Sequence, residues 1–212
     1  MDPLAAVPVS TLCDVDKSLP VADPAIRPLT RARVCGPAFT VVAAGEFLSV
    51  LHAIAEAQPG DVLVVQAGGA PLAALGELLA TEAARKGLGG IVVDGYVRDR
   101  TGLPADFPLW ARGTVPVAGR SDIAPRTGGP IAFGGLRVTP GDVVLADDDG
   151  IVIAPRAQLD ACLERAAEIE RTEAAVLAAV RGGASLIDMT NLTEHVAALR
   201  AGEASALAIT PP

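Results

Sequence analysis

Short apolar runs, each bounded by glycine, proline or aspartate, limit how this chain can fold. VLVV at 62–65 and IVV at 91–93 have the length and composition of buried strands, and a stretch with helical spacing of apolar residues precedes each of them. Half of the residues are hydrophobic but only 3% are aromatic, so the core must be built mainly from Ala, Val, Leu and Ile. Such a core suits close packing of helices on a sheet, and the sequence predicts an α/β fold.

The first half of the chain alternates strand and helix patterns. We expect a strand at 38–44, a helix at 46–57, a strand at 62–65 and a helix at 71–86 that Gly87 closes. The start of the last helix stays open, because Pro71 suits a first helical position whereas Gly76 would suit a restart. Only a restart would leave the amides of residues 76–79 free to bind an anion.

The second half consists of short β segments and then helices. Residues 104–154 suggest a compact β unit made of PLWARG, TVPVAG, PIAFGGLRV, DVVLADDDG and IVIAP. A long amphipathic helix at 156–181, a shorter helix at 191–201 and a frayed tail follow. Because no stretch has the composition of a linker, we expect a single domain over 1–212, with a core at 1–155 and a helical segment at 156–212.

Two further patterns have structural interpretations. PGDVLVV at 59–65 and PGDVVLA at 140–146 indicate two strands that start from the same tight turn. The acidic run 147–149 could suggest a Ca²⁺ loop, but it lacks the alternating ligands and the distant glutamate of an EF-hand. We therefore predict a solvated turn there.

Charge and composition narrow the function classes. The formal net charge is -8 at pH 7, so we expect no general affinity for nucleic acid or for an anionic membrane. The apolar run AAVLAAV at 174–180 is far shorter than a bilayer-spanning helix, and no segment resembles a secretory signal, so we expect a cytoplasmic protein. The three cysteines have no metal-type spacing, and we expect them to be reduced and buried.

Several mechanisms lack the residues that they need. The chain has no GxSxG, GxGxxG or Walker motif, and two histidines cannot form a three-histidine zinc site. His52 falls in an apolar helical pattern, where we expect a packed side chain. The two lysines are also poor Schiff-base candidates, because Lys17 lies near the N-terminus and Lys86 at the charged end of a helix.

The segment IVVDGYVRD at 91–99 instead suggests a site for a small anion beside Mg²⁺ or Mn²⁺. Asp94, Arg98 and Asp99 follow a buried strand, and Glu77 lies near the start of the helix that leads into it. Hard oxygen ligands, glycine-rich backbone and arginine suit this chemistry. The alternatives are a solvated ion pair in a turn and, for Glu77, an acidic residue that interacts with a helix dipole.

Three segments together resemble one family: GELLATEAARKGLGGIVVDGYVRD at 76–99, ARGTVP at 111–116 and PGDVVLADDDGIVIAP at 140–155. It contains the regulator of ribonuclease activity A and the class II 4-hydroxy-4-methyl-2-oxoglutarate aldolases, which also decarboxylate oxaloacetate. The resemblance runs from about residue 9 to 155. It implies a β/β/α sandwich of the swivelling-domain type, and a homotrimer or hexamer with active sites between subunits.

The resemblance also implies roles for individual residues. Pyruvate, or another small 2-oxo acid, would be bound by backbone amides of Gly76, Glu77, Leu78 and Leu79 and by the Arg98 side chain. Asp99 would anchor the divalent metal, Mg²⁺ or Mn²⁺, and its presence favours the catalytic branch over the ribonuclease regulators. A neighbouring subunit would add an acidic residue, for which the candidates are Glu168, Glu170 and Glu173.

Two positions depart from the family pattern and bear on the shape of the site. Leu75 stands where relatives frequently have tryptophan, and Gln66 stands where an acidic residue is common.

These residues suggest a lyase that forms the enolate of pyruvate. Cleavage of a 4-hydroxy-2-oxo acid and decarboxylation of oxaloacetate both produce this enolate, which the metal and Arg98 would stabilise. The resemblance further implies that Glu77 would position a metal-bound water that returns a proton to carbon, and we expect Asp94 to shape the turn and orient Arg98. The alternatives are a non-catalytic ribonuclease regulator and another metal-dependent oxo-acid enzyme on the same scaffold.

Overall fold

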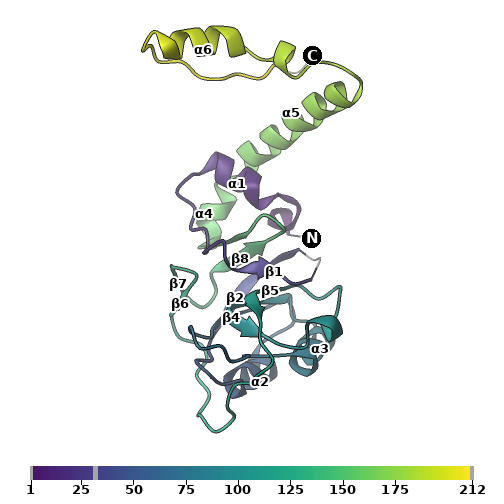
Figure 1. The fold of residues 1–212 in the computed structure, drawn as a ribbon, viewed down its shortest axis with the longest axis vertical. Helices are drawn as coiled ribbons and strands as arrows, with labels where there is room; N and C mark the ends of the chain where they lie inside the picture. Colours follow the sequence, from purple (N-terminus) through teal and green to yellow (C-terminus); the bar gives the residue numbers. More distant parts are fainter. Residues whose placement is uncertain (1, 31–32, 211–212) are drawn as a thin grey trace. The chain divides into compact units, whose positions relative to one another are not determined.

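The computed structural model describes residues 2–30 and 33–210, which fall into two compact units, 1–163 and 164–212. Figure 1 shows the course of the chain. In the first unit, the strands of the main sheet are β1 (Arg27–Pro28), β2 (Val34–Val42), β3 (Val62–Gln66), β4 (Gly90–Val97), β5 (Leu109–Thr114), β8 (Val143–Ala146) and β9 (Ile151–Ala154). Their order is β1-β5-β4-β3-β2-β8-β9. A separate hairpin consists of β6 (Ile131–Phe133) and β7 (Leu136–Val138).

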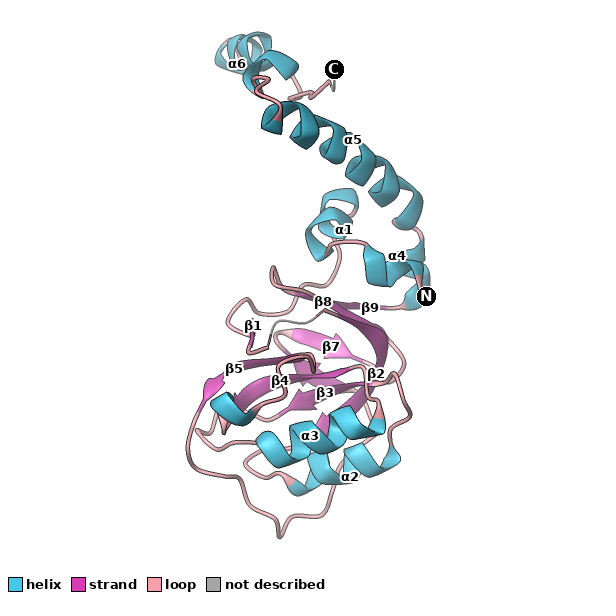
Figure 2. Cartoon of the chain, turned by 90° about the vertical axis from the view of Figure 1, so that its right-hand side faces the viewer, coloured by secondary structure: helices cyan, strands magenta, loops and turns pink. Residues whose placement is uncertain are grey.

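The four central strands, β2 to β5, are parallel to one another. β1 runs antiparallel to β5, β8 runs antiparallel to β2, and β9 runs antiparallel to β8. Parallel neighbours need crossover connections, and the helices α2 (Leu48–Glu56) and α3 (Glu77–Lys86) supply two of them. Both helices lie against the same face of the sheet (Figure 2). As a result, the carboxyl ends of β3 and β4 reach the edge where α3 begins.

Two apolar clusters fill the two sides of the sheet. The cluster under α2 and α3 joins Ile54 and Ala80 of these helices to Val65 and Val93 of the strands. The other cluster contains Trp110 and Phe133, so it joins the sheet to the β6–β7 hairpin. The alternation of side chains along each strand explains the division, since successive residues point to opposite faces. This arrangement confirms the predicted β/β/α sandwich.

The two PGD turns are equivalent in structure, as predicted. Gly60 and Gly141 have φ angles of 90° and 89°, which glycine adopts without strain. In each turn the following aspartate accepts a hydrogen bond from a backbone amide three residues before it, at 2.7 Å for Asp61 and 2.8 Å for Asp142. The strands that they start, β3 and β8, flank β2 on its two sides.

Several predicted elements differ from those observed. β2 begins at Val34 rather than residue 38, and residues 104–154 do not form a unit of their own. β5 joins one edge of the parallel strands, whereas β8 and β9 extend the other side of the sheet beyond β2. TVPVAG contributes to no strand beyond the end of β5 and makes isolated bridges instead. Sequence patterns identify strands but do not say which strands pair.

The acidic run 147–149 forms the turn between β8 and β9, as predicted, but it is more than a solvated turn. Asp147 accepts a hydrogen bond from the amide of Val9 at 2.9 Å, where α1 (Val9–Val15) begins. Its carbonyl also accepts one from the Trp110 indole at 3.3 Å. The hydrogen bonds of Asp147 thus connect α1 to the sheet.

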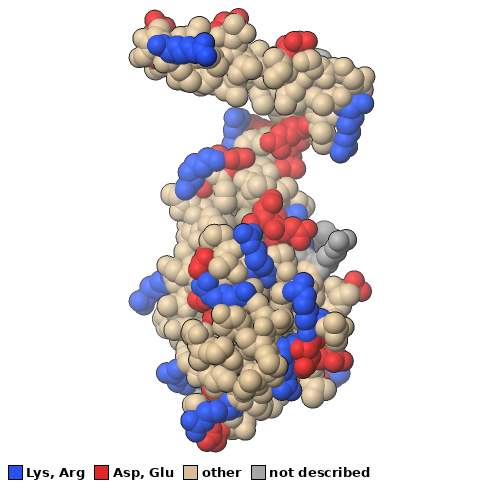
Figure 3. Space-filling view, in the orientation of Figure 1, with Lys and Arg blue, Asp and Glu red and all other residues tan. Residues whose placement is uncertain are grey.

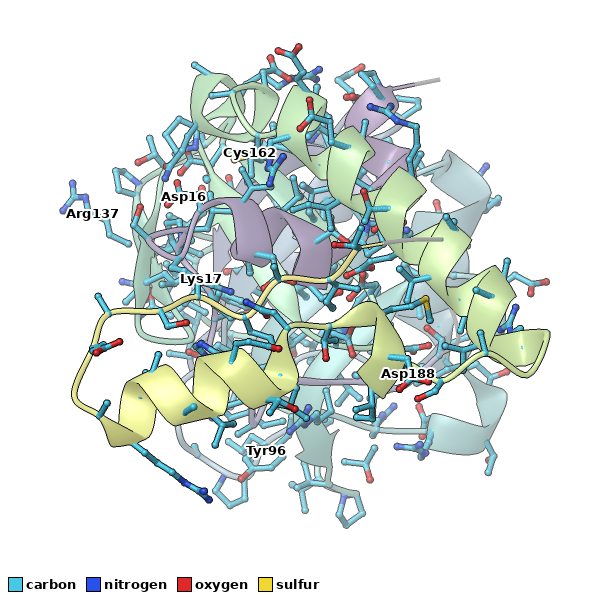
Figure 4. All side chains as sticks on the ribbon, turned by 90° about the horizontal axis from the view of Figure 1, so that it is seen from above. Asp16, Lys17, Tyr96, Arg137, Cys162 and Asp188 are labelled. Atoms are coloured by element: carbon cyan, nitrogen blue, oxygen red, sulfur yellow. The ribbon has the colours of Figure 1, made fainter. Side chains whose placement is uncertain are left out.

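Three side chains also differ from expectation. His52 is exposed on α2 and pairs with Glu56 at 3.3 Å, because the apolar face of α2 runs through Val50, Ala53 and Ile54 instead. All three cysteines are free, but only Cys162 is fully buried. Burial raises the pKa of the Cys162 thiol, which is labelled in Figure 4.

The helix predicted at 156–181 is broken at residues 161–162 into α4 (Arg156–Asp160) and α5 (Leu163–Arg181). Beyond α5, the second unit contains the short 3-10 helix η3 (Ile187–Met189) and α6 (Leu192–Arg200). The tail is not frayed through residue 210, because the Asn191 side chain bonds to the carbonyl of Ala206 and the amide of Ala208. Residues 211–212 lie outside the described residues. The prediction of a single domain stays a prediction.

None of the helices in residues 2–30 and 33–210 is long and apolar enough to cross a membrane. On the face shown in Figure 3, acidic and basic side chains lie intermixed over the first unit.

Candidate active site

The site begins where β4 ends. Arg98 directly follows β4, and its amide donates to the carbonyl of Leu75 at 3.0 Å. Asp99 comes next with a left-handed backbone, φ 58° and ψ 39°. Its Oδ2 atom accepts from Arg98 Nε at 3.2 Å. The two residues that follow β4 thus form an ion pair between a guanidinium and a carboxylate.

The N-terminus of α3 faces this ion pair. Gly76 is the N-cap residue, and the amide of Glu77 donates to Asp99 Oδ2 at 3.4 Å. The amides of Leu78 and Leu79 make no hydrogen bond to any residue in the described part of the chain. A helix start with free amides and a positive dipole end is suited to bind an anion. Of the two starts left open by the sequence, the structure therefore has the restart at Gly76.

Glycine at position 76 allows the helix and the strand to approach closely. A Cβ atom there would collide with Asp99 Oδ2 and would lie 2.8 Å from Arg98 Cγ. The backbone angles of Gly76 are extended, so the requirement comes from the neighbouring side chains and not from the conformation. Any larger residue would push Arg98 and Asp99 away from the helix start.

A cavity of about 180 Å³ lies beside these groups. Its charged lining consists of Arg98 and Asp99, and the rest of its wall is mainly apolar. The other lining residues are Phe47, Ala73, Leu75, Gly76, Leu78, Leu79 and Ala118. The cavity is large enough for a small oxo acid, and its lining combines two charged side chains with a mainly apolar wall.

Main-chain hydrogen bonds hold the walls of the cavity together. Ala73 donates to the carbonyl of Val117 at 2.8 Å and accepts from the amide of Gly119 at 2.9 Å. On its other side, the amide of Ala74 donates to the carbonyl of Tyr96 at 2.9 Å; Tyr96 is labelled in Figure 4. These segments form a small ribbon beyond the carboxyl ends of the parallel strands, where ligands commonly bind in α/β sheets.

The structure brings together six residues predicted for the site, namely Gly76, Glu77, Leu78, Leu79, Arg98 and Asp99. Their chemical roles stay predictions. Glu77 is exposed at the first position of α3, and its carboxylate lies against the backbone of Gly102. Leu78 is 81% exposed, so only part of this side chain can belong to the cavity wall of a single chain.

Asp94 does not orient Arg98, contrary to expectation. Its carboxylate accepts from Arg112 Nε at 2.5 Å and from the amide of Gly134 at 2.8 Å. Arg112 also donates to Asp23 at 2.7 Å, and these hydrogen bonds, led by the one to Asp94, raise its pKa. Asp94 is therefore part of a structural network on the hairpin side of the sheet.

Neither lysine lies at the cavity. The Lys86 ammonium group donates to the carbonyls of Ile54 and Ala55, both at 2.6 Å, at the end of α2. Lys17 pairs with Asp14 just beyond α1, and it is labelled in Figure 4. A lysine imine at this cavity has no candidate residue.

The donor set at the site fits a hard divalent ion. Asp99 Oδ1 accepts no hydrogen bond from the residues described, so one carboxylate oxygen is available. In residues 2–30 and 33–210 there is no group of three His, Cys, Asp or Glu side chains that could enclose a metal. Mg²⁺ is commonly held by one or two carboxylates together with water and substrate oxygens, so Asp99 fits this kind of binding.

The structure adds four residues to the site that no sequence pattern indicated. Phe47, Ala73 and Ala118 line the cavity, and Gly102 contacts Glu77. All four are apolar or lack a side chain, so no chemical pattern marked them. Gln66, which stands where relatives often carry an acid, accepts from the amide of Ala132 at 3.2 Å and does not line the cavity.

The amino-acid sequence matches a known family along most of the chain. A family model described as RraA-like, Aldolase/RraA, covers residues 9–153. The chain belongs to this family. An RraA-like relative from Halalkalibacterium halodurans, named "Putative 4-hydroxy-4-methyl-2-oxoglutarate aldolase", is 37% identical over 164 residues, which is 76% of this chain and 78% of that protein.

Solved RraA-like structures have the same fold. Streptomyces coelicolor RraAS2, described as an unusual member of the RNase ES inhibitor RraA family, matches with a TM-score of 0.70 and 34% identity over 81% of this chain and 91% of its own. The RNA-processing inhibitor RraA from Thermus thermophilis matches with a TM-score of 0.65 and 30% identity, over 70% of this chain and 92% of its own. The RraA-like family thus includes proteins named as aldolases and proteins named as ribonuclease inhibitors.

Proposed function

We propose that this protein is a divalent-metal-dependent lyase. It cleaves 4-hydroxy-2-oxo acids of the 4-hydroxy-4-methyl-2-oxoglutarate type to pyruvate and a second oxo acid, and it decarboxylates oxaloacetate. The aldolase names of its relatives support the lyase class. The observation that carries the proposal is the cavity at which Arg98, Asp99 and the free amides of α3 meet.

Both reactions leave an electron pair on a carbon next to a 2-oxo group. When the carbon–carbon bond breaks, this pair moves into the enolate of pyruvate, and its oxygen becomes negative. The other product leaves as carbon dioxide from oxaloacetate, or as an oxo acid whose former 4-hydroxyl group has lost its proton to water. Arg98 donates hydrogen bonds to the substrate carboxylate or to this oxygen. The amides of Leu78 and Leu79 add two fixed donors from the helix start.

Asp99 holds the divalent ion, Mg²⁺ or Mn²⁺. Bound there, the ion supplies a positive centre that polarises the 2-oxo group. The positions of Lys17 and Lys86 support this chemistry, because a lysine imine is the usual alternative and neither ammonium group reaches the cavity.

Glu77 directs the proton that completes the reaction. Its carboxylate orients a water toward the enolate carbon, and a proton from that water converts the enolate to pyruvate. The exposed position of Glu77 at the first turn of α3 supports this role, because solvent can restore the proton after each turnover.

We further propose that the protein assembles as a homotrimer or hexamer, in which a neighbouring copy completes the site. The 81% exposed side chain of Leu78 supports this assembly, since a large apolar side chain next to a cavity favours a partner surface. The acidic residue expected from that copy is one of Glu168, Glu170 and Glu173 on α5.

Removal of the metal tests the proposal directly. Pyruvate release from oxaloacetate and from 4-hydroxy-4-methyl-2-oxoglutarate is measured with Mg²⁺, then with an excess of chelator, and again after Mg²⁺ is restored. We expect activity to disappear with the chelator and to return with the ion. Release of pyruvate that the chelator does not change would contradict the mechanism.

A second candidate function is that of a ribonuclease regulator, because the matched solved structures include RraA inhibitors. Such a protein needs neither Arg98 nor a metal. Inhibition of a ribonuclease that persists in Arg98→Ala, together with no pyruvate from a panel of oxo acids, would favour it. Activity on a different oxo acid in the same panel would instead favour another metal-dependent enzyme on this scaffold.

A further inference from the structure

Gly102 closes the short turn that follows Asp99. The 3-10 helix η2 spans Arg100–Gly102, and the amide of Gly102 donates to the carbonyl of Asp99 at 2.9 Å. This hydrogen bond fixes the Gly102 backbone relative to the end of β4.

The carboxylate of Glu77 lies directly against this glycine. A Cβ atom at position 102 would collide with Glu77 Oε2, would lie 2.5 Å from Cδ and would come within 3.1 Å of Oε1. The whole carboxylate group therefore faces the bare Cα of Gly102. Any side chain at position 102 would occupy the space that the carboxylate now fills.

The backbone itself does not require glycine at this position. Gly102 is not among the glycines with a positive φ, so an alanine could adopt the same conformation. The lack of a side chain at position 102 leaves space for the carboxylate of Glu77 and is not needed for the conformation of the turn.

We propose that Gly102 is a positioning residue, which fixes the Glu77 carboxylate relative to Asp99. The turn at 99–102 contacts Glu77 at both ends: Asp99 Oδ2 accepts from its amide at 3.4 Å, and Gly102 makes room for its carboxylate. One turn thus sets the place of both acidic groups of the site. The inference rests on the proposed function, in which Glu77 directs the returning proton.

An alanine at position 102 should move the carboxylate without unfolding the protein. The atoms that it would meet are the far end of a flexible, exposed side chain, which can rotate away at little cost. We therefore expect Gly102→Ala to keep the Tm of the wild type while it displaces the carboxylate of Glu77.

Kinetics of the full chain with Mg²⁺ and oxaloacetate test the proposal. We expect Gly102→Ala to lower kcat by about a hundredfold, as misplacement of a catalytic group by about 1 Å does, with KM little changed because Arg98 and the α3 amides stay in place. Gly150→Ala is the matched control, since a Cβ there meets nothing within 4 Å and the residue lies in the β8–β9 turn. We expect this control to match the wild type.

A double-mutant cycle distinguishes an effect of Gly102 that acts through Glu77 from an effect that does not depend on Glu77. If Gly102 acts through Glu77, then Gly102→Ala has no further effect on kcat once Glu77→Ala has removed the carboxylate. An equal loss in both backgrounds would overturn the proposal. A wild-type kcat for Gly102→Ala would also overturn it.

Crystal structures of the wild type and of Gly102→Ala give a readout that does not depend on activity. A displaced Glu77 carboxylate supports the proposal, and an unmoved carboxylate overturns it. If the wild type releases no pyruvate but the carboxylate still moves, the proposed lyase function fails while the positioning of Glu77 by Gly102 stands.

Discussion

Asp99 combines backbone strain with an available carboxylate. It is the only non-glycine residue with a positive φ among residues 2–30 and 33–210. Aspartate tolerates the left-handed region better than most residues, and the amide of Gly102 and the guanidinium of Arg98 hold it there. Strained residues of this kind are common at functional sites. The Asp99 carboxylate lies at the start of α3, where it accepts from the amide of Glu77.

Substitution of either charged residue at the end of β4 should abolish most activity. We expect Asp99→Asn, which keeps the backbone preference, and Arg98→Ala each to lower kcat by roughly a hundred to a thousandfold, equivalent to about 2.7–4 kcal/mol. Pyruvate release from oxaloacetate with Mg²⁺ measures the effect.

The controls are Asp14→Asn and Arg85→Ala, which break exposed ion pairs with Lys17 and Glu82. We expect both controls to retain wild-type rates. Wild-type rates in both site variants would refute the assigned roles.

For single residues, the sequence predicted the charged residues of the site but not the residues of its apolar wall. Arg98 and Asp99 are charges at the end of an apolar strand, which is an unusual and visible pattern. Phe47 and Ala118 have no such mark, because an apolar residue in a cavity wall has the same sequence signal as one in the core. Asp94 was misassigned because its partners, Arg112 and Gly134, are distant from it in the sequence.

Among the elements, β4, β5 and the β6–β7 hairpin are linked by one guanidinium. Arg112 on β5 donates to Asp94 on β4 and to Asp23, while Asp94 and Asp23 contact the backbone of Gly134 in the hairpin. The hydrogen bond from the amide of Ala25, followed by that from Arg112, lowers the pKa of Asp23. The network joins the N-terminal segment to the sheet.

This lowered pKa predicts how stability depends on pH. A carboxylate with a lowered pKa in the folded state stabilises the protein fully above the ordinary pKa of aspartate, and the effect is lost as the pH falls through the lowered value. We expect the Tm of Asp23→Asn to be below that of the wild type at pH 7. The two should converge as the pH falls below about 4.

Thermal unfolding between pH 7 and pH 2.5 measures this difference. Asp148→Asn, at an exposed position in the β8–β9 turn, is the control and should behave as the wild type does. A difference between Asp23→Asn and the wild type that stays constant across this range would contradict the assignment.

Close packing of β2 against the turn before β3 should make Gly36 sensitive to substitution. A Cβ at Gly36 would collide with the carbonyl oxygen of Gly60, and one at Gly89 would lie 2.7 Å from the same atom. Backbone cannot rotate away as a side chain can, so we expect Gly36→Ala to cost about 1–3 kcal/mol. Denaturant unfolding measures this loss. Gly69→Ala, which meets nothing within 4 Å, should leave stability close to that of the wild type.

The elements show where sequence patterns are sufficient and where they are not. β3, β4, β8 and β9 are continuous apolar runs with clear turn residues, so their positions could be predicted. The alanines between Pro71 and Gly76 favour a helix as strongly as those after it. Ala73 and Ala74 instead bond to Val117 and Tyr96, and such contacts with distant segments override local propensity.

In the whole molecule, both apolar clusters lie between residues 22 and 153. The family model covers nearly the same span, 9–153. In the second unit, Ala166 is the only buried residue among those described. Cooperative stability must therefore come from the first unit.

A truncation tests this division. We expect a chain that ends at Arg181, and so keeps α5, to retain the Tm of the full chain within about 3 °C, which corresponds to about 1 kcal/mol in a protein of this size. Circular dichroism at 222 nm during heating measures the transition. A loss of ten degrees or more would show that residues 182–212 support the fold.

In the ribbon beyond the carboxyl ends of the strands, backbone groups make the hydrogen bonds and side chains line the cavity. Backbone groups of Ala73, Ala74 and Gly119 make its connections, while the side chains at 73, 75 and 118 face the ligand space. We expect larger or polar side chains at these three positions to change which small molecules the cavity accepts, while the backbone framework stays intact. The wall of the cavity can thus be varied residue by residue on a constant backbone.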